Sequence, residues 1–467
     1  MARGFDDLHC YVQVPQTSAE CQQAVWPEFG AKTMSTQRGN FYGEYPKVYY
    51  ATMRLFAGTD VEASALTMRI VNVAIFVGLA TSLAILLPVT RRRTLLLGWL
   101  VTLVPLGMFL IPSNNPSGWA ITGVGTAFLA LLGWFEATGN KRWGLAALYI
   151  VGVLMAGGAR GDAAVYALGA TVTVLMLTVA RDRRWVVSAI LPGLGIMLAV
   201  ILLSTAAQAG VGATGFSDST GAVTSPTLGD PDAALAPLGG ISLVAYNLLM
   251  LPFLWTGVWG TWGLGWLDTS LPAIVPWAAA GAFVAVSFVA LSQLNWRKVC
   301  ALLGVFAVLV ALPTYVLSAG GDKVGANLQP RYVLPLIVLF GFLLLVEPAG
   351  RVIQFSRVQT GVILGALFIA NLVALQVNIR RYVTGDDQQG FNLDAGKEWW
   401  WSWLPVGPLT IWIIGLSSFG GLLVVLWPAL QNAIAPSSGL APDRTPSRAG
   451  VDVKKGHPAP QIDEAPV

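Results

Sequence analysis

Charged residues and histidines are scarce in this sequence. Charged residues make up 11% of the 467 positions, whereas hydrophobic residues make up 55%. The two histidines, His9 and His457, lie outside every long apolar run. A histidine metal site or a histidine proton relay inside a membrane is therefore excluded, and we assign no metal ligands. The sequence also lacks a glycine-rich phosphate loop beside its basic connections, which argues against a nucleotide donor.

Two further classes of protein find no support in the sequence. No helix carries a series of acidic residues, and no matching halves contain glycine-interrupted helices, so a transport signature is lacking. The net charge is +4. Because the basic residues are spread along the chain rather than gathered in one patch, we expect no nucleic-acid partner.

Apolar runs of spanning length are the dominant feature, and they recur as far as residue 427. The mean hydropathy is +0.64. The runs are continuous rather than alternating, which favours helices over strands. We predict an all-α, polytopic transmembrane helical bundle with about eleven spans. The expected spans are 67–87, 95–111, 119–134, 143–157, 163–180, 186–203, 272–292, 299–317, 332–346, 359–377 and 408–427.

Lysine and arginine pairs or triplets fall at every second connection between these spans. The positive-inside rule then predicts a multi-pass plasma-membrane protein whose N-terminal segment lies outside and whose C-terminal tail is cytoplasmic. We expect an extracytoplasmic segment over 1–63, a transmembrane domain over 64–429 and a disordered tail over 430–467. The outer loops would be 204–271, 318–331 and 378–407.

The apolar run 241–260 needs separate treatment, since it is long enough to span. Its neighbours on either side already fit the alternation, so it must cross twice or not at all. Pro252 interrupts it and four tryptophans crowd its end, which favours a helix that lies in or dips into the outer leaflet.

The exported N-terminal segment carries no signal-peptide pattern. We therefore expect about twenty apolar residues encoded upstream of Met1, which would bring the bundle to twelve spans.

Arg331 stands between Pro330 and Tyr332 at the edge of an apolar run, in the stretch 318–336. A guanidinium there must find an anionic partner or extend to the head groups. A phosphate handled on the outer side would arrive on a lipid, so Arg331 is a candidate ligand for it. The simpler interpretation is an interfacial anchor.

Other polar residues at the outer helix mouths are candidates with simpler alternatives. Arg160 and Asp162 would pair across a tight turn, the turn at Asn115 would cap a helix, and Asp268 would cap a helix that starts near residue 271. The substrate-binding candidates are Arg331, Gln329, Arg160, Asp162, Arg69, Asn115 and Asp268.

The N-terminal segment contains a candidate base and a cysteine pair. Glu44 lies among tyrosines in 41–50, where a partly desolvated carboxylate would act as a general base. The alternative is a solvated glutamate. Cys10 and Cys21 would form a disulfide in an exported segment, whereas Cys300 reads as a small packing residue.

Several motifs in the same order resemble the family catalogued as domain of unknown function 2142, which is common in actinobacteria. The similarity runs from about residue 9 to about residue 427. The motifs are the two-cysteine segment, YPKVYY (45–50), Met68–Arg69, SNNPSGWAIT (113–122), GARGD (158–162), GLGWLDTSLP (263–272) and LQPRYVLPL (328–336).

That family looks like a branch of the GT-C glycosyltransferases, which use polyprenyl-phosphate sugars. The resemblance implies that Arg331 contacts the donor phosphate, with Arg160 or Arg69 as second contacts, and that a divalent cation sometimes assists. It also implies an acidic base in the first outer loop. The family's Asp-Glu pair follows its first span, and Asp6 and Asp7 do not fit that motif, so the main acid is expected upstream of Met1.

We therefore expect a GT-C-like glycosyltransferase at the outer face that modifies a cell-envelope glycan or lipid. Its partners would be membrane lipid and a polyprenyl-phosphate sugar. The alternative is a non-catalytic lipid or glycan translocase, or an assembly partner of envelope enzymes.

Overall fold

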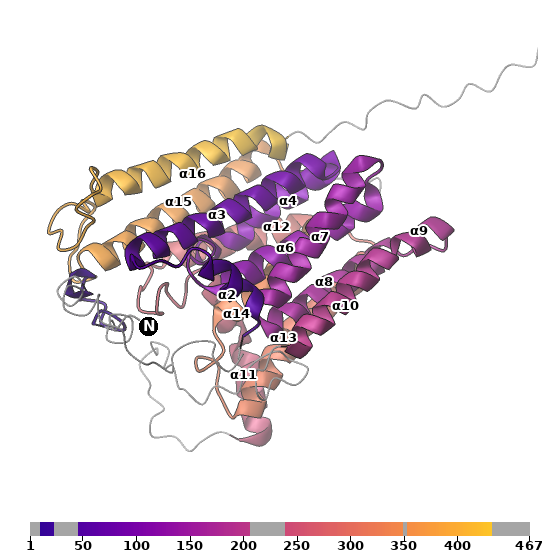
Figure 1. The fold of residues 1–467 in the computed structure, drawn as a ribbon, viewed down its shortest axis with the longest axis horizontal. Helices are drawn as coiled ribbons and strands as arrows, with labels where there is room; N and C mark the ends of the chain where they lie inside the picture. Colours follow the sequence, from indigo (N-terminus) through magenta and orange to yellow (C-terminus); the bar gives the residue numbers. More distant parts are fainter. Residues whose placement is uncertain (1–9, 23–44, 206–238, 349–352, 432–467) are drawn as a thin grey trace, which may run out of the picture. The chain divides into compact units, whose positions relative to one another are not determined.

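The computed structural model describes residues 10–22, 45–205, 239–348 and 353–431 (Figure 1). Across these ranges the regular elements are helices, so the predicted all-α class is confirmed. In chain order they are α2 (Lys47–Arg54), α3 (Val61–Leu86), α4 (Val89–Leu103), α5 (Leu106–Leu110), α6 (Pro116–Glu136), α7 (Asn140–Ala159), α8 (Gly161–Thr178), α9 (Arg183–Ser188), α10 (Ile190–Thr205), α11 (Gly240–Thr256), η3 (Gly257–Trp259), α12 (Ile274–Ala290), α13 (Trp296–Gly320), α14 (Pro330–Leu345), α15 (Arg357–Val383) and α16 (Pro408–Gln431).

Nine helices in the described ranges are long and apolar enough to cross a membrane, and α12 and α14 are shorter apolar helices. The chain is thus a multi-pass membrane protein. The nine include α11, whereas the expected span 95–111 is divided into α4 and α5. Pro105 stands between these two helices, where it cannot donate a backbone hydrogen bond. The number of crossings and their direction stay predictions.

Helix α6 lies at the centre of the bundle, with 94% of its apolar window buried, against 11% for α3 and α16. Its closest neighbour is α7. A Cβ atom on Gly123 would lie 2.6 Å from the carbonyl oxygen of Gly152 and from the amide nitrogen of Ala156. Only glycine allows the two backbones to approach this closely.

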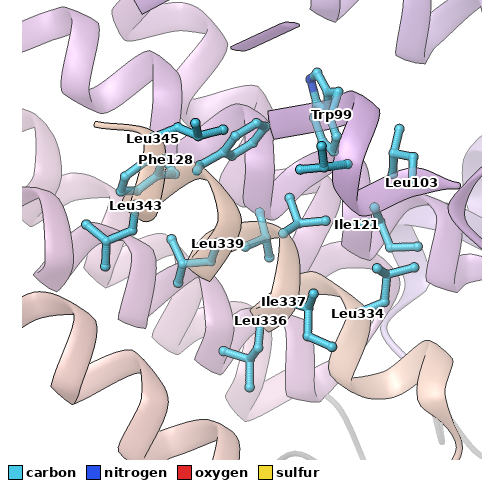
Figure 2. Packing of buried hydrophobic residues seen from close by; sticks show 14 of the residues in the cluster. Trp99, Leu103, Ile121, Phe128, Leu334, Leu336, Ile337, Leu339, Leu343 and Leu345 are labelled. Atoms are coloured by element: carbon cyan, nitrogen blue, oxygen red, sulfur yellow. The ribbon is translucent and has the colours of Figure 1, made fainter. Parts of the chain in front are cut away.

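The interior between α4, α6 and α14 is apolar (Figure 2). Trp99 packs edge-on against Phe342 at 4.9 Å between ring centroids, and Phe128 stacks against the same ring at 6.3 Å. After Tyr332, every residue of α14 is apolar. A continuous column of apolar side chains therefore separates the two ends of α14.

Helix α11 enters the bundle from one end and the chain returns to that end. Its Asn247 donates to the carbonyl oxygen of Asp322, just beyond the end of α13. The ring of Trp259 lies 4.8 Å from that of Phe283 in α12, and its Nε1 donates to the Val101 carbonyl, two residues before the end of α4. The following loop returns to the mouths of α6 and α14. The run Gly240–Trp259 is long and apolar enough to cross a membrane, so its placement in the outer leaflet stays a prediction.

Candidate functional site

A cavity of about 230 Å³ opens where α6 and α14 begin, and we call it the Arg331 pocket. One wall is the loop 262–267 with its two tryptophans, and another is formed by α5. The polar side chains that line it are Ser113, Asn114, Asn115, Gln329, Arg331 and Tyr382. Three sequence-predicted residues, Arg331, Gln329 and Asn115, therefore meet in one pocket.

The N-termini of α6 and α14 line this pocket. Each of these helices begins with an N-cap residue that is followed by a proline. Asn115 caps α6 by accepting a hydrogen bond from the Ser117 amide at 2.9 Å, as the simpler interpretation predicted. Gln329 occupies the N-cap of α14, and Pro330 follows it. Unpaired amides and the helix dipoles make such ends favourable for anions.

The loop that closes the pocket has an unusual backbone. Gly263, Gly265 and the non-glycine Leu267 have φ angles of 79°, 66° and 66°. A Cβ atom on Gly265 would lie 2.8 Å from the Tyr382 hydroxyl. Left-handed backbone at a residue such as Leu267 costs about 1–3 kcal/mol and concentrates at binding sites. The loop is thus held in place by its surroundings.

Arg331 is the only charged side chain in the described lining of this pocket. Its guanidinium donates to the Tyr332 hydroxyl at 3.1 Å and lies 5.0 Å from the centroid of that ring. Its Nε is buried and has no hydrogen-bond partner among the described residues. The pocket therefore presents a positive charge with unused donor capacity.

Arg160 and Asp162 form a bidentate ion pair, with distances of 2.8 and 3.0 Å. Burial alone would lower the pKa of Arg160, but the charge and hydrogen bond of Asp162, together with Tyr332 and Tyr45, raise the pKa above its ordinary value. The Arg160 guanidinium also covers the Tyr332 ring at 4.3 Å. The pair does not line the pocket and instead supports the residue that Arg331 touches.

Asp268 is buried beside the pocket and does not cap α12, which begins at Ile274. The carboxylate accepts from Arg381 at 2.8 Å and from the Gln13 amide at 3.1 Å. Arg381 is 1% exposed and also donates to the carbonyls of Thr17 and Tyr11. Asp268 thus anchors the N-terminal segment, within which Cys10 and Cys21 form a disulfide.

Sequence reasoning missed Arg381. A signal was available, because two adjacent arginines, Arg380 and Arg381, end a span on the side where the positive-inside rule expects few basic residues. Such an exception indicates a structural or functional partner.

Residues 6–340 match the profile of a family described as predicted membrane protein, DUF2142. The chain belongs to this family. No curated protein and no solved structure matches it. The DUF2142 match covers the pocket residues from Ser113 to Arg331, whereas Arg381 and Tyr382 lie beyond its end.

The remaining candidate site residues of this DUF2142 protein either lie away from the Arg331 pocket or fall outside the residues that the structure describes. Arg69 is exposed, and its Nε donates to the Pro112 carbonyl at 3.1 Å, which ties α3 to the turn before α6. Glu44 lies outside the described residues. No group of three histidine, cysteine, aspartate or glutamate side chains in the described ranges could hold a metal ion. The described lining of the pocket likewise offers no carboxylate for a divalent cation.

Proposed function

We propose that this protein is an integral membrane glycosyltransferase that takes a sugar from a polyprenyl-phosphate donor in the Arg331 pocket. The pocket would face the outer side of the plasma membrane, and the acceptor would be a cell-envelope glycan or lipid. The observation that carries this proposal is the single uncompensated guanidinium of Arg331 at two helix N-termini. The resemblance to GT-C enzymes supplies the reaction type.

The chemistry of the leaving group suits this arrangement. When the bond from the sugar to the phosphate breaks, negative charge grows on the phosphate oxygens. A guanidinium and helix amides already in place stabilise that charge without reorganising. The neutral amides of Asn114, Asn115 and Gln329 offer donors and acceptors for sugar hydroxyls.

A second candidate is a non-catalytic protein that holds a lipid-linked glycan. It is favoured by the absence of any carboxylate in the described lining, since glycosyl transfer requires a base for the acceptor. In the glycosyltransferase the candidate for this base is Glu44, which lies outside the described residues. A translocase is less well supported, because α14 presents an apolar column between its two ends.

The test incubates the purified full-length protein in lipid vesicles with labelled polyprenyl-phosphate sugars and measures transfer to an envelope extract. Arg331→Ala is expected to reduce transfer by about 100-fold or more, the usual effect of removing a donor that stabilises a developing oxyanion. Arg331→Lys keeps the charge but loses the forked pair of guanidinium donors, so its transfer rate should lie between those of the wild type and Arg331→Ala.

The matched control is Arg54→Ala, at an exposed position at the end of α2, which should leave transfer unchanged. Undiminished transfer by Arg331→Ala would remove Arg331 from the mechanism. Retention of the labelled donor without any turnover would instead support the non-catalytic candidate.

A further inference from the structure

A second, larger cavity of about 1280 Å³ lies at the opposite end of α14, and we call it the Lys298 cavity. The ends of α6, α8 and α13 enclose it together with α9. Its cationic lining side chains are Arg91, Arg142, Arg183, Arg184, Arg297 and Lys298. Its acidic lining side chains are Glu136, Asp182 and Glu347.

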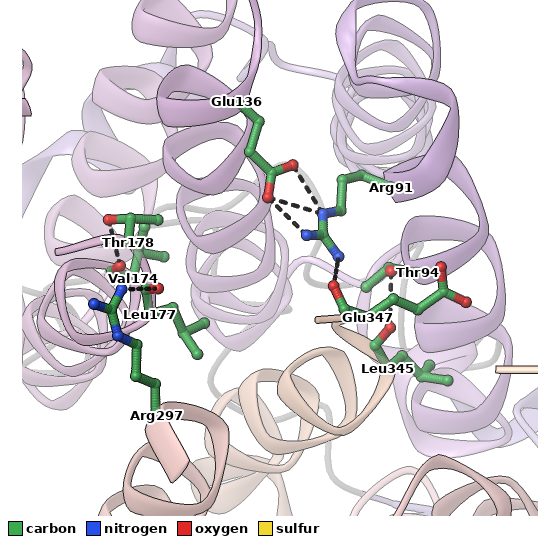
Figure 3. A network of polar contacts seen from close by, with 9 residues as sticks. All are labelled: Arg91, Thr94, Glu136, Val174, Leu177, Thr178, Arg297, Leu345 and Glu347. Carbon is green, nitrogen blue, oxygen red and sulfur yellow. Dashed lines mark hydrogen bonds and ion pairs between the residues drawn. The ribbon is translucent and has the colours of Figure 1, made fainter. Parts of the chain in front are cut away.

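Each of the three carboxylates already has a partner. Glu136 forms a salt bridge with Arg91 at 2.7 Å, and the same guanidinium donates to the main-chain carbonyl of Glu347 (Figure 3). Asp182 caps α9 by accepting from the Trp185 amide at 2.7 Å. The carboxylate of Glu347 accepts from the Ile353 amide at 2.9 Å. Of the three, only Glu136 forms an ion pair with a described residue, and the charge of the Glu347 carboxylate also attracts Lys298.

The six cations nevertheless outnumber the three carboxylates, so the cavity has an excess of positive charge. Among the described residues, Arg91 is the only cation of this cavity in an ion pair. Arg297 donates to the Leu177 carbonyl at 3.4 Å, on another side of the network in Figure 3, and lies 5.7 Å from the centroid of the Trp296 ring. Arg142 is held in place against the Trp134 ring at 3.8 Å and beside the Ser188 hydroxyl.

Lys298 distinguishes this cavity from an ordinary basic membrane edge. The positive-inside rule accounts for exposed lysines and arginines at one end of a bundle, but Lys298 is 1% exposed. Its ammonium donates to the Gln293 carbonyl at 3.1 Å and forms no ion pair with a described residue. Because a buried charge without a direct ion pair is destabilising, an anion from outside the chain would stabilise it.

The other lining residues identify the kind of anion. Large apolar side chains, among them Leu132, Phe135, Leu177 and Trp296, share the cavity with the cations. A ligand with a phosphate group and an attached hydrocarbon would satisfy both surfaces, and basic pockets between transmembrane helices bind such head groups. We propose that the Lys298 cavity binds the phosphodiester head group of an anionic glycerophospholipid from the adjacent leaflet.

The experiment measures lipid retained by the full-length protein in micelles by native mass spectrometry, with dioleoylphosphatidylglycerol and dioleoylphosphatidylcholine as probes. The wild type should keep phosphatidylglycerol and not phosphatidylcholine. Lys298→Gln and Arg184→Gln should each weaken retention by about fivefold, as expected for the removal of one cation near a membrane surface. Arg184 is exposed, so its variant reports binding even if Lys298→Gln does not fold.

Two matched controls separate this site from its surroundings. Lys141→Gln removes an exposed cation that precedes Arg142 and does not line the cavity, and Arg54→Gln removes an exposed cation at the end of α2 that lines neither cavity. Both should retain the lipid as the wild type does. Equal retention by Arg184→Gln and the wild type, equal binding of phosphatidylcholine, or displacement by millimolar inorganic phosphate would each overturn the lipid assignment.

Discussion

The two ends of α14 present positive charge in different ways. The Arg331 pocket has about 230 Å³ and combines one guanidinium with neutral amides and no described carboxylate. The Lys298 cavity has about 1280 Å³ and gathers six cations around three carboxylates. A small pocket with one charge and several neutral donors suits one defined group, whereas a large cavity with many cations suits an anionic head group of variable shape.

The difference also shows why the two sites are separate. Polar groups at both ends are joined by an apolar helix, whose residues from Val333 to Leu345 include none that can hydrogen-bond through a side chain. An ion or head group crossing along this helix would lose its hydrogen bonds within the interior. The comparison therefore predicts two independent anion sites rather than one path.

The largest expected effect concerns the sides of the membrane on which the two sites lie. In a Cys300→Ser background, Asn114→Cys should react with a membrane-impermeant maleimide added to intact cells, whereas Arg184→Cys should react only after permeabilisation. Both positions are exposed, so accessibility does not limit either reaction. The measurement is a mass-tag shift on a gel. Reaction of both cysteines from the same side would contradict the placement of the two sites on opposite sides of the membrane.

The next effect concerns the ion pairs near each site. Asp268→Ala leaves the buried Arg381 unpaired and should cost about 3–5 kcal/mol of unfolding free energy. Glu136→Ala breaks the ion pair with Arg91. Because the Glu136 side chain is 28% exposed, this variant should cost only about 1 kcal/mol of unfolding free energy. Thermal and denaturant unfolding followed by tryptophan fluorescence would compare the two. Asp268→Ala combined with Arg381→Met should recover part of the loss, and equal costs for both single variants would contradict this prediction.

The smallest effect concerns Tyr49 of α2, which packs edge-on against Trp119 of α6 at 5.3 Å between ring centroids. Burial raises the pKa of Tyr49 to about 12, and the Tyr49 hydroxyl has no hydrogen-bond partner among the described residues. The unfolded chain has a tyrosine pKa of about 10, so this contribution is complete below pH 10 and is lost as the pH rises towards 12.

At pH 11 the loss should be about 1.4 kcal/mol, relative to pH 8. Tyr49→Phe removes the titrating group and should lose less stability over the same interval. Unfolding measured at several pH values for both proteins gives the comparison. Identical pH profiles would show that Tyr49 titrates normally.

Some features followed from local sequence. Helix α6 is a continuous apolar run after Asn115 and Pro116, so its existence and its cap were both predictable. The motifs around Arg331 and Gln329 identified the family, and both residues line the pocket. Hydropathy and capping act within one helix, so they can be read from neighbouring residues.

Other features depended on residues far apart in the chain. Asp268 and Arg381 are separated by 113 positions, and no local pattern indicated that they pair. The break of the span 95–111 at Pro105 and the return of the chain after α11 depend on what packs beside them. Neither the burial of Lys298 nor its position in a large cavity could be inferred from a basic helix start.

The sequence by itself therefore determined an all-α, multi-pass membrane protein of the DUF2142 family with a basic side and a less basic one. Only the tertiary structure decided which charges are paired, because an ion pair forms wherever packing brings two groups together. It left Arg331 without a carboxylate among the described residues and gave Arg160 and Arg381 one each. That distribution, set by contacts between distant helices, is what singles out the Arg331 pocket.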